Sequence, residues 1–208
     1  MKKALFFDLD DTIYPTVSVV DDMYKELFHL LKPRVSEDVF QAIRTDILST
    51  PFHTVADRYA LKKDVKEEGL RISLDMTYGG SMETFNDYEL TRGIKMDKFL
   101  ITAGYVKLQQ SKIRQLQIQD DFREIFIPDP YRSVLTKGDI FKQIMLKYEY
   151  APSDVLVIGD NPESEILFAR ELGIETYLYD YEGKYSPALA DYYGTSYEGF
   201  TDIAALQH

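Results

Sequence analysis

The chain has 208 residues, of which 45% are hydrophobic, so it can bury a sizeable core and is not a disordered protein. Its 24 Lys and Arg against 35 Asp and Glu give a net charge of −11, and without a Lys/Arg cluster this charge disfavours nucleic acid and anionic lipid as partners. The absence of cysteine excludes disulfides, thiol nucleophiles and cysteine-ligated metals, so any metal must be held by oxygen or histidine.

The first residues do not read as an export signal, because the apolar run that begins at Ala4 is interrupted at Asp8. No run of about 18 apolar residues occurs, so no membrane span is predicted. The lack of cysteine also fits a reducing compartment. We therefore expect a soluble, cytoplasmic protein, whose oligomeric state the sequence does not indicate.

Short apolar runs bounded by polar residues, glycine or proline predict five strands. They lie at residues 4–7, 99–101, 125–127, 155–158 and 176–179. Each run is unbroken rather than alternating, which is typical of strands buried on both faces of a parallel sheet. The runs therefore favour an α/β protein.

A long interval without strands follows the first run and predicts an insertion over 13–96. Apolar residues recur at helical spacing over 23–31 and 39–47, and more weakly over 61–65 in a helix that stops by Gly69. We interpret the insertion as a mostly helical cap domain over the carboxyl ends of the strands, where open α/β sheets bind ligands. A separate domain with its own partner is the alternative.

Strand and helix alternate in the second half of the chain. One helix carries an apolar stripe over 140–148 with Asp139 as a plausible N-cap, and another begins at Asn161-Pro162-Glu163 and ends before Gly173. A short closing helix is expected over 200–206. This alternation predicts right-handed βαβ units in a doubly wound parallel sheet, formed by residues 1–12 and 97–208.

Acidic residues follow two of the predicted strands directly. Asp8-Leu9-Asp10-Asp11-Thr12 comes after the first strand, and Gly159-Asp160 ends the fourth. If these strands are neighbours, Asp8 and Asp160 converge at one edge of the sheet, and clustered carboxylates need a cation to offset their repulsion. Oxygen ligands alone favour Mg²⁺.

Three further polar groups lie at strand ends or helix starts on the same rim. Thr102-Ala103-Gly104 ends the second strand and supplies a hydroxyl and backbone N–H groups that suit an anionic oxygen. Lys137 stands just before a predicted helix N-terminus. A cation interacts unfavourably with the helix dipole there, so the placement of Lys137 indicates a function. Glu165 follows Asp160 in the same segment.

In these residues and their order, the chain resembles the haloacid dehalogenase-like hydrolase superfamily. Residues 6–12, Phe-Phe-Asp-Leu-Asp-Asp-Thr, match its first motif, and Thr102 corresponds to the second. Lys137 followed by Phe141 corresponds to the third, and Gly159-Asp160 with Glu165 to the fourth. The resemblance implies a Rossmann-like core, a helical cap inserted after the first motif, and phosphatase-type chemistry.

The same resemblance implies a role for each matching residue. Asp8 is the nucleophile that forms an aspartyl-phosphate, while Asp10 protonates the leaving oxygen and then activates water. Mg²⁺ is held by the Asp8 and Asp160 carboxylates and the Asp10 backbone carbonyl, with Glu165 beside these ligands. The phosphate is bound at Thr102, Ala103 and Lys137, although Ala103 stands where the family commonly has Asn, which leaves substrate contacts there open.

The presence of Asp10 argues against dehalogenation and phosphonate cleavage, because the dehalogenases and phosphonatases of the superfamily lack this second acid. We expect hydrolysis of a small phosphorylated metabolite, a nucleotide or sugar phosphate, and Tyr14-Pro15 is similar to nucleotidase-like members. A phosphomutase, a phospho-accepting receiver module and a non-catalytic scaffold are the alternatives; the order of the motifs argues against a receiver. Candidate substrate contacts in the cap are Tyr24, His53, Arg58, Tyr59, Arg71 and Tyr78.

Overall fold

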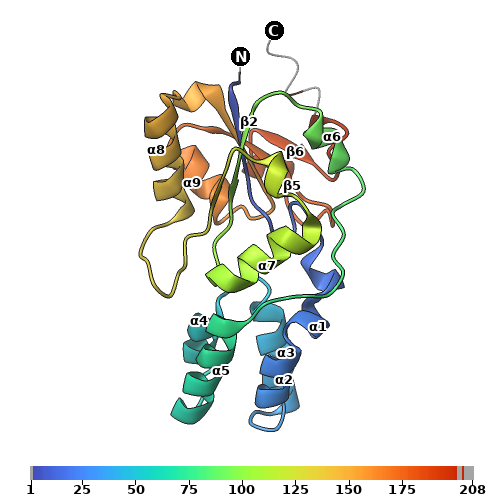
Figure 1. Ribbon diagram of the computed structural model, residues 1–208, viewed down its shortest axis with the longest axis vertical. Helices are drawn as coiled ribbons and strands as arrows, with labels where there is room; N and C mark the ends of the chain where they lie inside the picture. The colour runs from blue at the N-terminus through green and yellow to red at the C-terminus, as the bar shows by residue number, and fades with distance from the viewer. Residues whose placement is uncertain (1, 201–202, 204–208) are drawn as a thin grey trace.

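A six-stranded parallel sheet lies at the centre of the computed structural model, which describes residues 2–200 and 203 (Figure 1). The strand order is β3-β2-β1-β4-β5-β6. The strands are β1 (Ala4–Phe7), β2 (Asp97–Ile101), β3 (Glu124–Phe126), β4 (Val155–Gly159), β5 (Glu175–Tyr179) and β6 (Tyr192–Gly194). The five predicted strands are confirmed, and the unpredicted β6 is a three-residue edge strand of partly buried residues without an apolar run.

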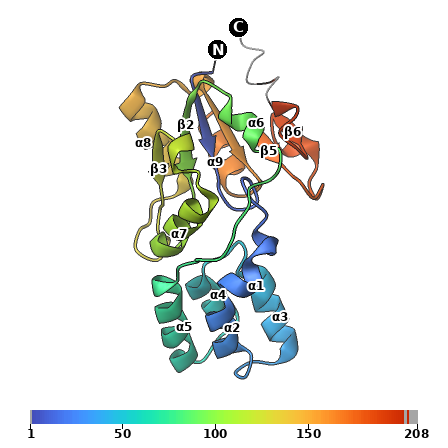
Figure 2. The same cartoon turned by 45° about the vertical axis from the view of Figure 1, so that its right-hand side comes forward.

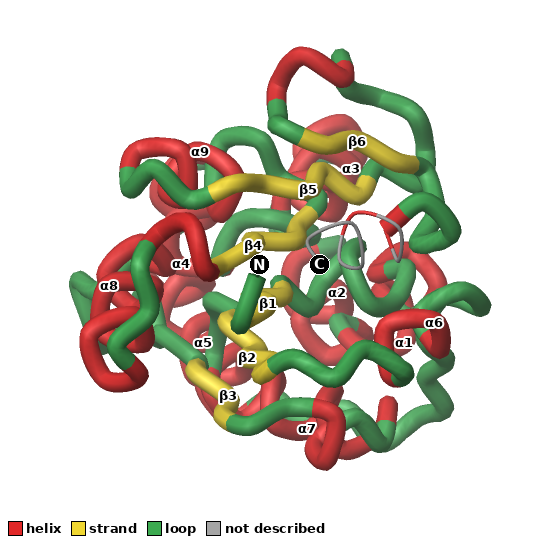
Figure 3. Tube along the Cα trace, turned by 90° about the horizontal axis from the view of Figure 1, so that it is seen from above, coloured by secondary structure: helices red, strands yellow, loops and turns green. Residues whose placement is uncertain are grey.

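Helices cover both faces of the sheet, as Figure 3 shows from above. Alternate residues of β1 face opposite sides, so Phe6 packs in a cluster with α8 (Lys137–Tyr148) and α9 (Glu165–Glu171). Phe7 packs on the other side in a larger cluster that includes α7 (Val106–Leu116) and the cap. The predicted doubly wound α/β architecture is confirmed.

Five helices between β1 and β2 form a layer beyond the carboxyl ends of the strands (Figure 2). They are α1 (Val20–Met23), α2 (Lys25–Leu31), α3 (Glu37–Asp46), α4 (Phe52–Arg58) and α5 (Lys63–Asp75). The predicted stripe over 23–31 is divided at Tyr24, which lies between α1 and α2. The short helix α4 lacks a long apolar stripe and was not predicted.

The helix expected to stop by Gly69 continues to Asp75. The glycine is kept there by packing, because a Cβ at this position would lie 2.3 Å from the Phe52 ring and 3.2 Å from Leu27. The cost of glycine in a helix interior is about 1 kcal/mol and is outweighed by this close approach of α2, α4 and α5.

The last part of the predicted insertion lies against the sheet rather than in the cap layer. The Phe85 N–H donates to the Ile13 carbonyl at 2.8 Å, and the Phe85 ring packs on Tyr179. The helix α6 (Glu89–Arg92) lies beside the core in Figure 1. The domain boundary at residue 96 stays a prediction, and Phe85 within the predicted insertion already contacts Tyr179 of β5.

Four 3₁₀ turns complete the described elements, at Thr16–Ser18, Gln119–Asp121, Pro152–Asp154 and Pro187–Leu189. The predicted closing helix over 200–206 lies outside the described residues, apart from Phe200, which is buried, and Ile203, which is partly buried. In the described part of the chain, no helix has the length and apolar character needed to span a membrane.

Candidate active site

The sheet register brings the predicted site residues to one edge. Phe7, the last residue of β1, pairs with Leu100 of β2 and with Ile158 of β4. Asp8 therefore emerges between the ends of these two strands, with Thr102 on one side and Asp160 on the other. Beyond Asp8 the chain leaves the strand conformation, as expected.

Asp11 makes the turn that carries the chain away from the sheet. Its backbone has a φ of 53°, a left-handed conformation that Asp tolerates better than most residues. Its carboxylate accepts a hydrogen bond from the Thr16 N–H at 2.8 Å, which fixes the turn. Asp11 is thus held by the local backbone, and it lines the same cavity as Asp8 and Asp10.

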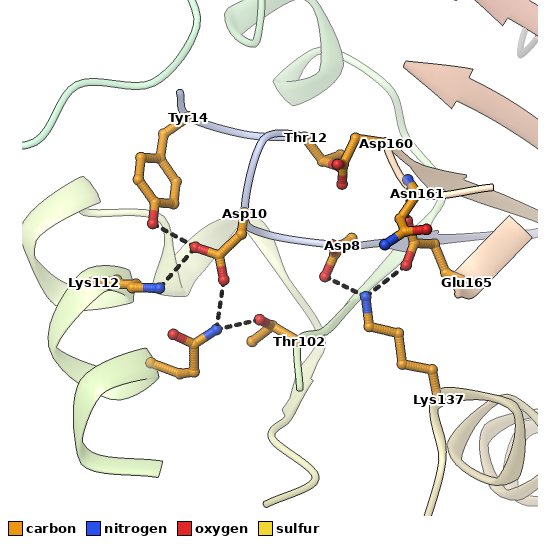
Figure 4. A network of polar contacts seen from close by, with 11 residues as sticks. Asp8, Asp10, Thr12, Tyr14, Thr102, Lys112, Lys137, Asp160, Asn161 and Glu165 are labelled. Carbon is orange, nitrogen blue, oxygen red and sulfur yellow. Dashed lines mark hydrogen bonds and ion pairs between the residues drawn. The ribbon is translucent and has the colours of Figure 1, made fainter. Parts of the chain in front are cut away.

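Lys137 lies between two buried carboxylates (Figure 4). Its Nζ is 2.7 Å from Asp8 Oδ1 and 2.7 Å from Glu165 Oε2, and all three side chains are less than a tenth exposed. Burial alone would lower the pKa of Lys137, but the two carboxylates raise it well above its ordinary value. Lys137 is therefore a permanent cation beside Asp8.

A capping box places Lys137 at the start of α8. Thr136 is the N-cap: its Oγ1 accepts from the Asp139 N–H at 3.2 Å, and the Asp139 carboxylate accepts from the Thr136 N–H at 3.0 Å. The expectation that Asp139 is the N-cap and that Lys137 precedes the helix was wrong, since Lys137 is its first residue. The negative charge of Asp139 in the first turn interacts favourably with the helix dipole.

Glu165 begins α9, later than predicted. Asn161 does not cap this helix, because its side chain accepts from the Glu163 N–H at 2.9 Å and closes a turn before the helix. The Glu165 oxygens accept from the Asn161 N–H at 2.8 Å and from Lys137 at 2.7 Å. With both oxygens engaged, Glu165 is suited to hold Lys137 rather than to bind substrate.

The Gly159→Ala variant is expected to displace Glu165, because a Cβ at position 159 would lie 2.3 Å from Glu165 Cγ and Oε1. Overpacking of this kind costs about 1–3 kcal/mol. We expect a lower midpoint of thermal unfolding and reduced turnover of any substrate. Gly199→Ala is the matched control, since nothing lies within 4 Å of its added Cβ; equal midpoints of the two variants would contradict this packing.

Asp8, Asp160 and Glu165 form a group of carboxylates whose oxygen atoms lie within 4.8 Å of one another. Burial raises the pKa of Asp8 to about 7, despite the opposing charge of Lys137. Burial and the nearby Glu165 and Asp8 raise the pKa of Asp160 as well. Two of these three carboxylates, Asp8 and Glu165, pair with the single ammonium of Lys137, and a divalent cation with a preference for oxygen fits the remaining negative charge.

Asp10 sits in a separate set of hydrogen bonds that the sequence did not predict. Lys112 Nζ lies 2.7 Å from Asp10 Oδ1, Gln109 Nε2 donates to Asp10 Oδ2 at 2.8 Å, and the Tyr14 hydroxyl also donates to Oδ1. Gln109 additionally donates to Thr102 Oγ1 at 2.5 Å, which links the second strand to this set. Figure 4 shows Lys112 and Tyr14 beside Asp10.

The three donors fix both the orientation and the charge of Asp10. Burial favours the protonated carboxyl, but the Lys112 ammonium and the hydrogen bonds bring the pKa of Asp10 below its ordinary value. The sequence contains one signal that could have identified these partners of Asp10. Gln109 and Lys112 are polar residues three positions apart, on one face of the helix that follows Thr102. Both are buried, which such polar residues rarely are without a partner.

Lys112→Met should reduce turnover by roughly 10- to 100-fold, the usual effect of losing a group that orients a residue of the site. The reason is that Asp10 would lose its only ionic partner within 4 Å among the described residues. Lys107→Met on the exposed side of the same helix is the control and should retain activity. Measured kcat values that are equal in the two variants would contradict the assigned role of Lys112.

The candidate substrate contacts in the cap are distributed differently. Tyr24 lines the cavity between cap and core, together with the predicted site residues Asp8, Asp10, Thr102, Ala103, Lys137, Asp160 and Glu165. The other candidates do not line this cavity. His53 contacts Tyr105, which does line it. The remaining candidates have partners elsewhere: Arg58 and Tyr59 with Asp46, Arg71 with Glu68, and Tyr78 with Ser111 through its backbone.

Known proteins resemble the chain in both sequence and fold. The profile of a hydrolase family, described as haloacid dehalogenase-like hydrolase, matches residues 2–173. A glyceraldehyde 3-phosphate phosphatase from Pyrococcus furiosus is 26% identical over 217 aligned positions, covering 91% of this chain and 85% of that protein. The family profile spans the residues from Asp8 to Glu165 and the insertion between the first two strands.

Solved structures share the fold at low sequence identity. A haloacid dehalogenase-like hydrolase from Streptococcus pneumoniae superposes with a TM-score of 0.72 at 19% identity, covering 99% of each chain. One from Bacillus subtilis, bound to magnesium, gives 0.71 at 16% identity over 98% of each chain. A 2-haloacid dehalogenase from Pseudomonas syringae gives 0.64 at 18% identity over the whole of both chains.

Proposed function

Because the chain belongs to the haloacid dehalogenase-like hydrolase family, we propose that it is a Mg²⁺-dependent phosphatase for a small phosphomonoester. The observation that carries this proposal is the Asp10 carboxylate, which shares a cavity with Asp8 and is oriented by three donors. Transfer of a phosphoryl group from an ester needs an acid for the leaving oxygen and a base for water. Asp10 can serve as both.

In the first step Asp8 attacks phosphorus with the carboxylate oxygen that is not bound to Lys137. The bond between phosphorus and the ester oxygen breaks, and the leaving oxygen takes a proton from Asp10, whose carboxylate binds that proton from water when the substrate phosphate brings negative charge beside it. The products are an aspartyl-phosphate on Asp8, the free alcohol and an ionised Asp10. Lys137 and Thr102 flank Asp8 and stabilise negative charge on the transferred group.

In the second step Asp10 removes a proton from water, and the oxygen of that water attacks the phosphorus of the aspartyl-phosphate. Inorganic phosphate leaves, and both Asp8 and the proton on Asp10 are restored. The donors Lys112, Gln109 and Tyr14 stabilise the ionised Asp10 that this step requires.

We place Mg²⁺ at the carboxylates of Asp8 and Asp160 and the backbone carbonyl of Asp10. The acidic group of Asp8, Asp160 and Glu165 supports this assignment, since it has more negative charge than Lys137 neutralises. When bound, the ion offsets charge on the phosphoryl oxygens. A structural relative from Bacillus subtilis is bound to magnesium, in keeping with this choice.

A sequence relative supports the substrate class, since the matched protein from Pyrococcus furiosus is named for the hydrolysis of a three-carbon phosphate ester. Dehalogenases share the fold, and a phosphomutase would retain both acids. Neither alternative is favoured by a specific contact of this chain, and Asp10 argues against dehalogenation.

Removal of the metal tests this proposal. The protein should release inorganic phosphate from p-nitrophenyl phosphate or glycerol 3-phosphate, and a chelator should reduce the rate at least about 100-fold until Mg²⁺ is restored. The control measures halide released from a 2-haloacid under the same conditions, where none is expected. Release of halide without release of phosphate would overturn the proposed reaction.

A further inference from the structure

The cavity over Asp8 has two chemically different walls. The core wall contains the acids and lysines of the site, whereas the cap wall consists of Tyr24 and residues 47–52. Three residues of this cap wall, Tyr24, Ser49 and Thr50, carry hydroxyl groups, and the others are apolar. Among the described residues that line the cavity, those of the cap include no charged side chain.

Both lysines of the core wall are already paired. Lys137 contacts Asp8 and Glu165, and Lys112 contacts Asp10, each at 2.7 Å. The cavity also contains Asp11 and Asp160, so its acids outnumber its bases. One phosphoryl group can be offset by the proposed metal, but a second anion on the substrate would enter a cavity with no cationic side chain left to pair with it among the described lining residues.

The basic side chains that follow the cap wall in the sequence do not change this balance. His53 follows the cap wall, but its Nδ1 is 3.1 Å from the Tyr105 hydroxyl, and burial lowers the pKa of this imidazole. At neutral pH His53 is therefore uncharged. Arg58 makes an ion pair with Asp46.

The volume of the cavity limits the size of the leaving group that it can enclose. It measures about 150 Å³. Pockets that enclose drug-sized ligands occupy roughly 300–1,000 Å³, and a nucleoside monophosphate belongs to that size class. A leaving group of a few carbon atoms fits, and its hydroxyls can bond to those of the cap wall.

We infer that the substrate is the phosphomonoester of a small, uncharged, hydroxylated alcohol, and that the cap wall disfavours substrates with a second anionic group. The inference rests on the proposed phosphatase function and narrows it. Of the substrate classes expected from the sequence, it favours short sugar or polyol phosphates over nucleotides.

Two substrates of nearly equal size test the charge selection. Glycerol 3-phosphate and 3-phosphoglycerate differ mainly by a carboxylate, and we expect kcat/KM to be at least about tenfold higher for the first. Uridine monophosphate should be hydrolysed at least about tenfold less efficiently than glycerol 3-phosphate. Equal kcat/KM for the two three-carbon esters, or a preference for the nucleotide, would overturn the inference while leaving the phosphatase function intact.

A cation added to the cap wall should change this selectivity. In Thr50→Lys the ratio of kcat/KM for 3-phosphoglycerate to that for glycerol 3-phosphate should rise about tenfold, and in the uncharged control Thr50→Gln it should not. The ratio is insensitive to partial loss of folded protein. An unchanged ratio in Thr50→Lys would overturn the role of the cap wall, whereas failure of the unmodified protein to release phosphate from every ester would overturn the proposed function instead.

Discussion

The Asp8→Asn variant is expected to lose phosphatase activity by roughly 10⁴-fold or more, because the amide cannot form the bond to phosphorus. It should nevertheless be more stable than the unmodified protein when both are measured in chelator at pH 8. Burial raises the pKa of Asp8 from 3.8 to about 7. A carboxyl group whose pKa is higher in the folded state than in the unfolded state destabilises the folded state at pH values above both pKa values.

Two measurements separate the loss of chemistry from the loss of structure. Initial rates with p-nitrophenyl phosphate and Mg²⁺ give the activity, and thermal unfolding in chelator gives the stability. Asp64→Asn, an exposed position on the cap, is the control and should leave both unchanged. An Asp8→Asn protein with unchanged turnover would show that another residue is the nucleophile.

The second large effect is expected for Lys137→Met, which should impair both activity and stability. The ammonium is buried between Asp8 and Glu165, so its removal leaves two buried carboxylates without their shared partner. Breaking a buried ion pair from one side costs about 3–5 kcal/mol. Loss of a cation beside the transferred group should also lower kcat/KM by roughly 10³-fold.

The control for this variant is Lys142→Met, on the exposed face of the same helix. It should have the unmodified activity and a free energy of unfolding within about 0.5 kcal/mol of the unmodified protein, as is usual at exposed sites. Denaturant unfolding and initial rates measure the two properties. Asp8→Asn and Lys137→Met are thus expected to change stability in opposite directions, and a shift in the same direction would contradict the charge balance described for this cluster.

The sheet was predictable because its strands carry a strong local signal. The runs at 4–7 and 155–158 are apolar on both faces, and the placement of acids directly after them indicated one shared edge. The edge strand β6 lacked such a signal, since its residues are only half-buried. The helix α5 was cut short in the prediction because the packing that retains Gly69 is not visible in the sequence.

The site was predictable only where motifs occur at strand ends. Asp8, Thr102 and Asp160 follow strands directly, and Lys137 starts a helix next to them, so topology alone brings them together. Gln109 and Lys112 lie inside a helix and reach Asp10 across about 100 positions of sequence, a contact that depends on how α7 packs. Helix starts were also misjudged at Asp139 and Asn161, where two polar residues competed for the role of cap.

The central claim is that the phosphoryl group passes through Asp8. It is tested most directly by stopping a reaction with isotopically labelled p-nitrophenyl phosphate in acid, within a single turnover, and locating the label by mass spectrometry of the peptides. We predict a phosphoryl group on Asp8 and none in the Asp8→Asn protein. A label on a different residue, or phosphate release without any labelled protein at any time in the turnover, would contradict the claim.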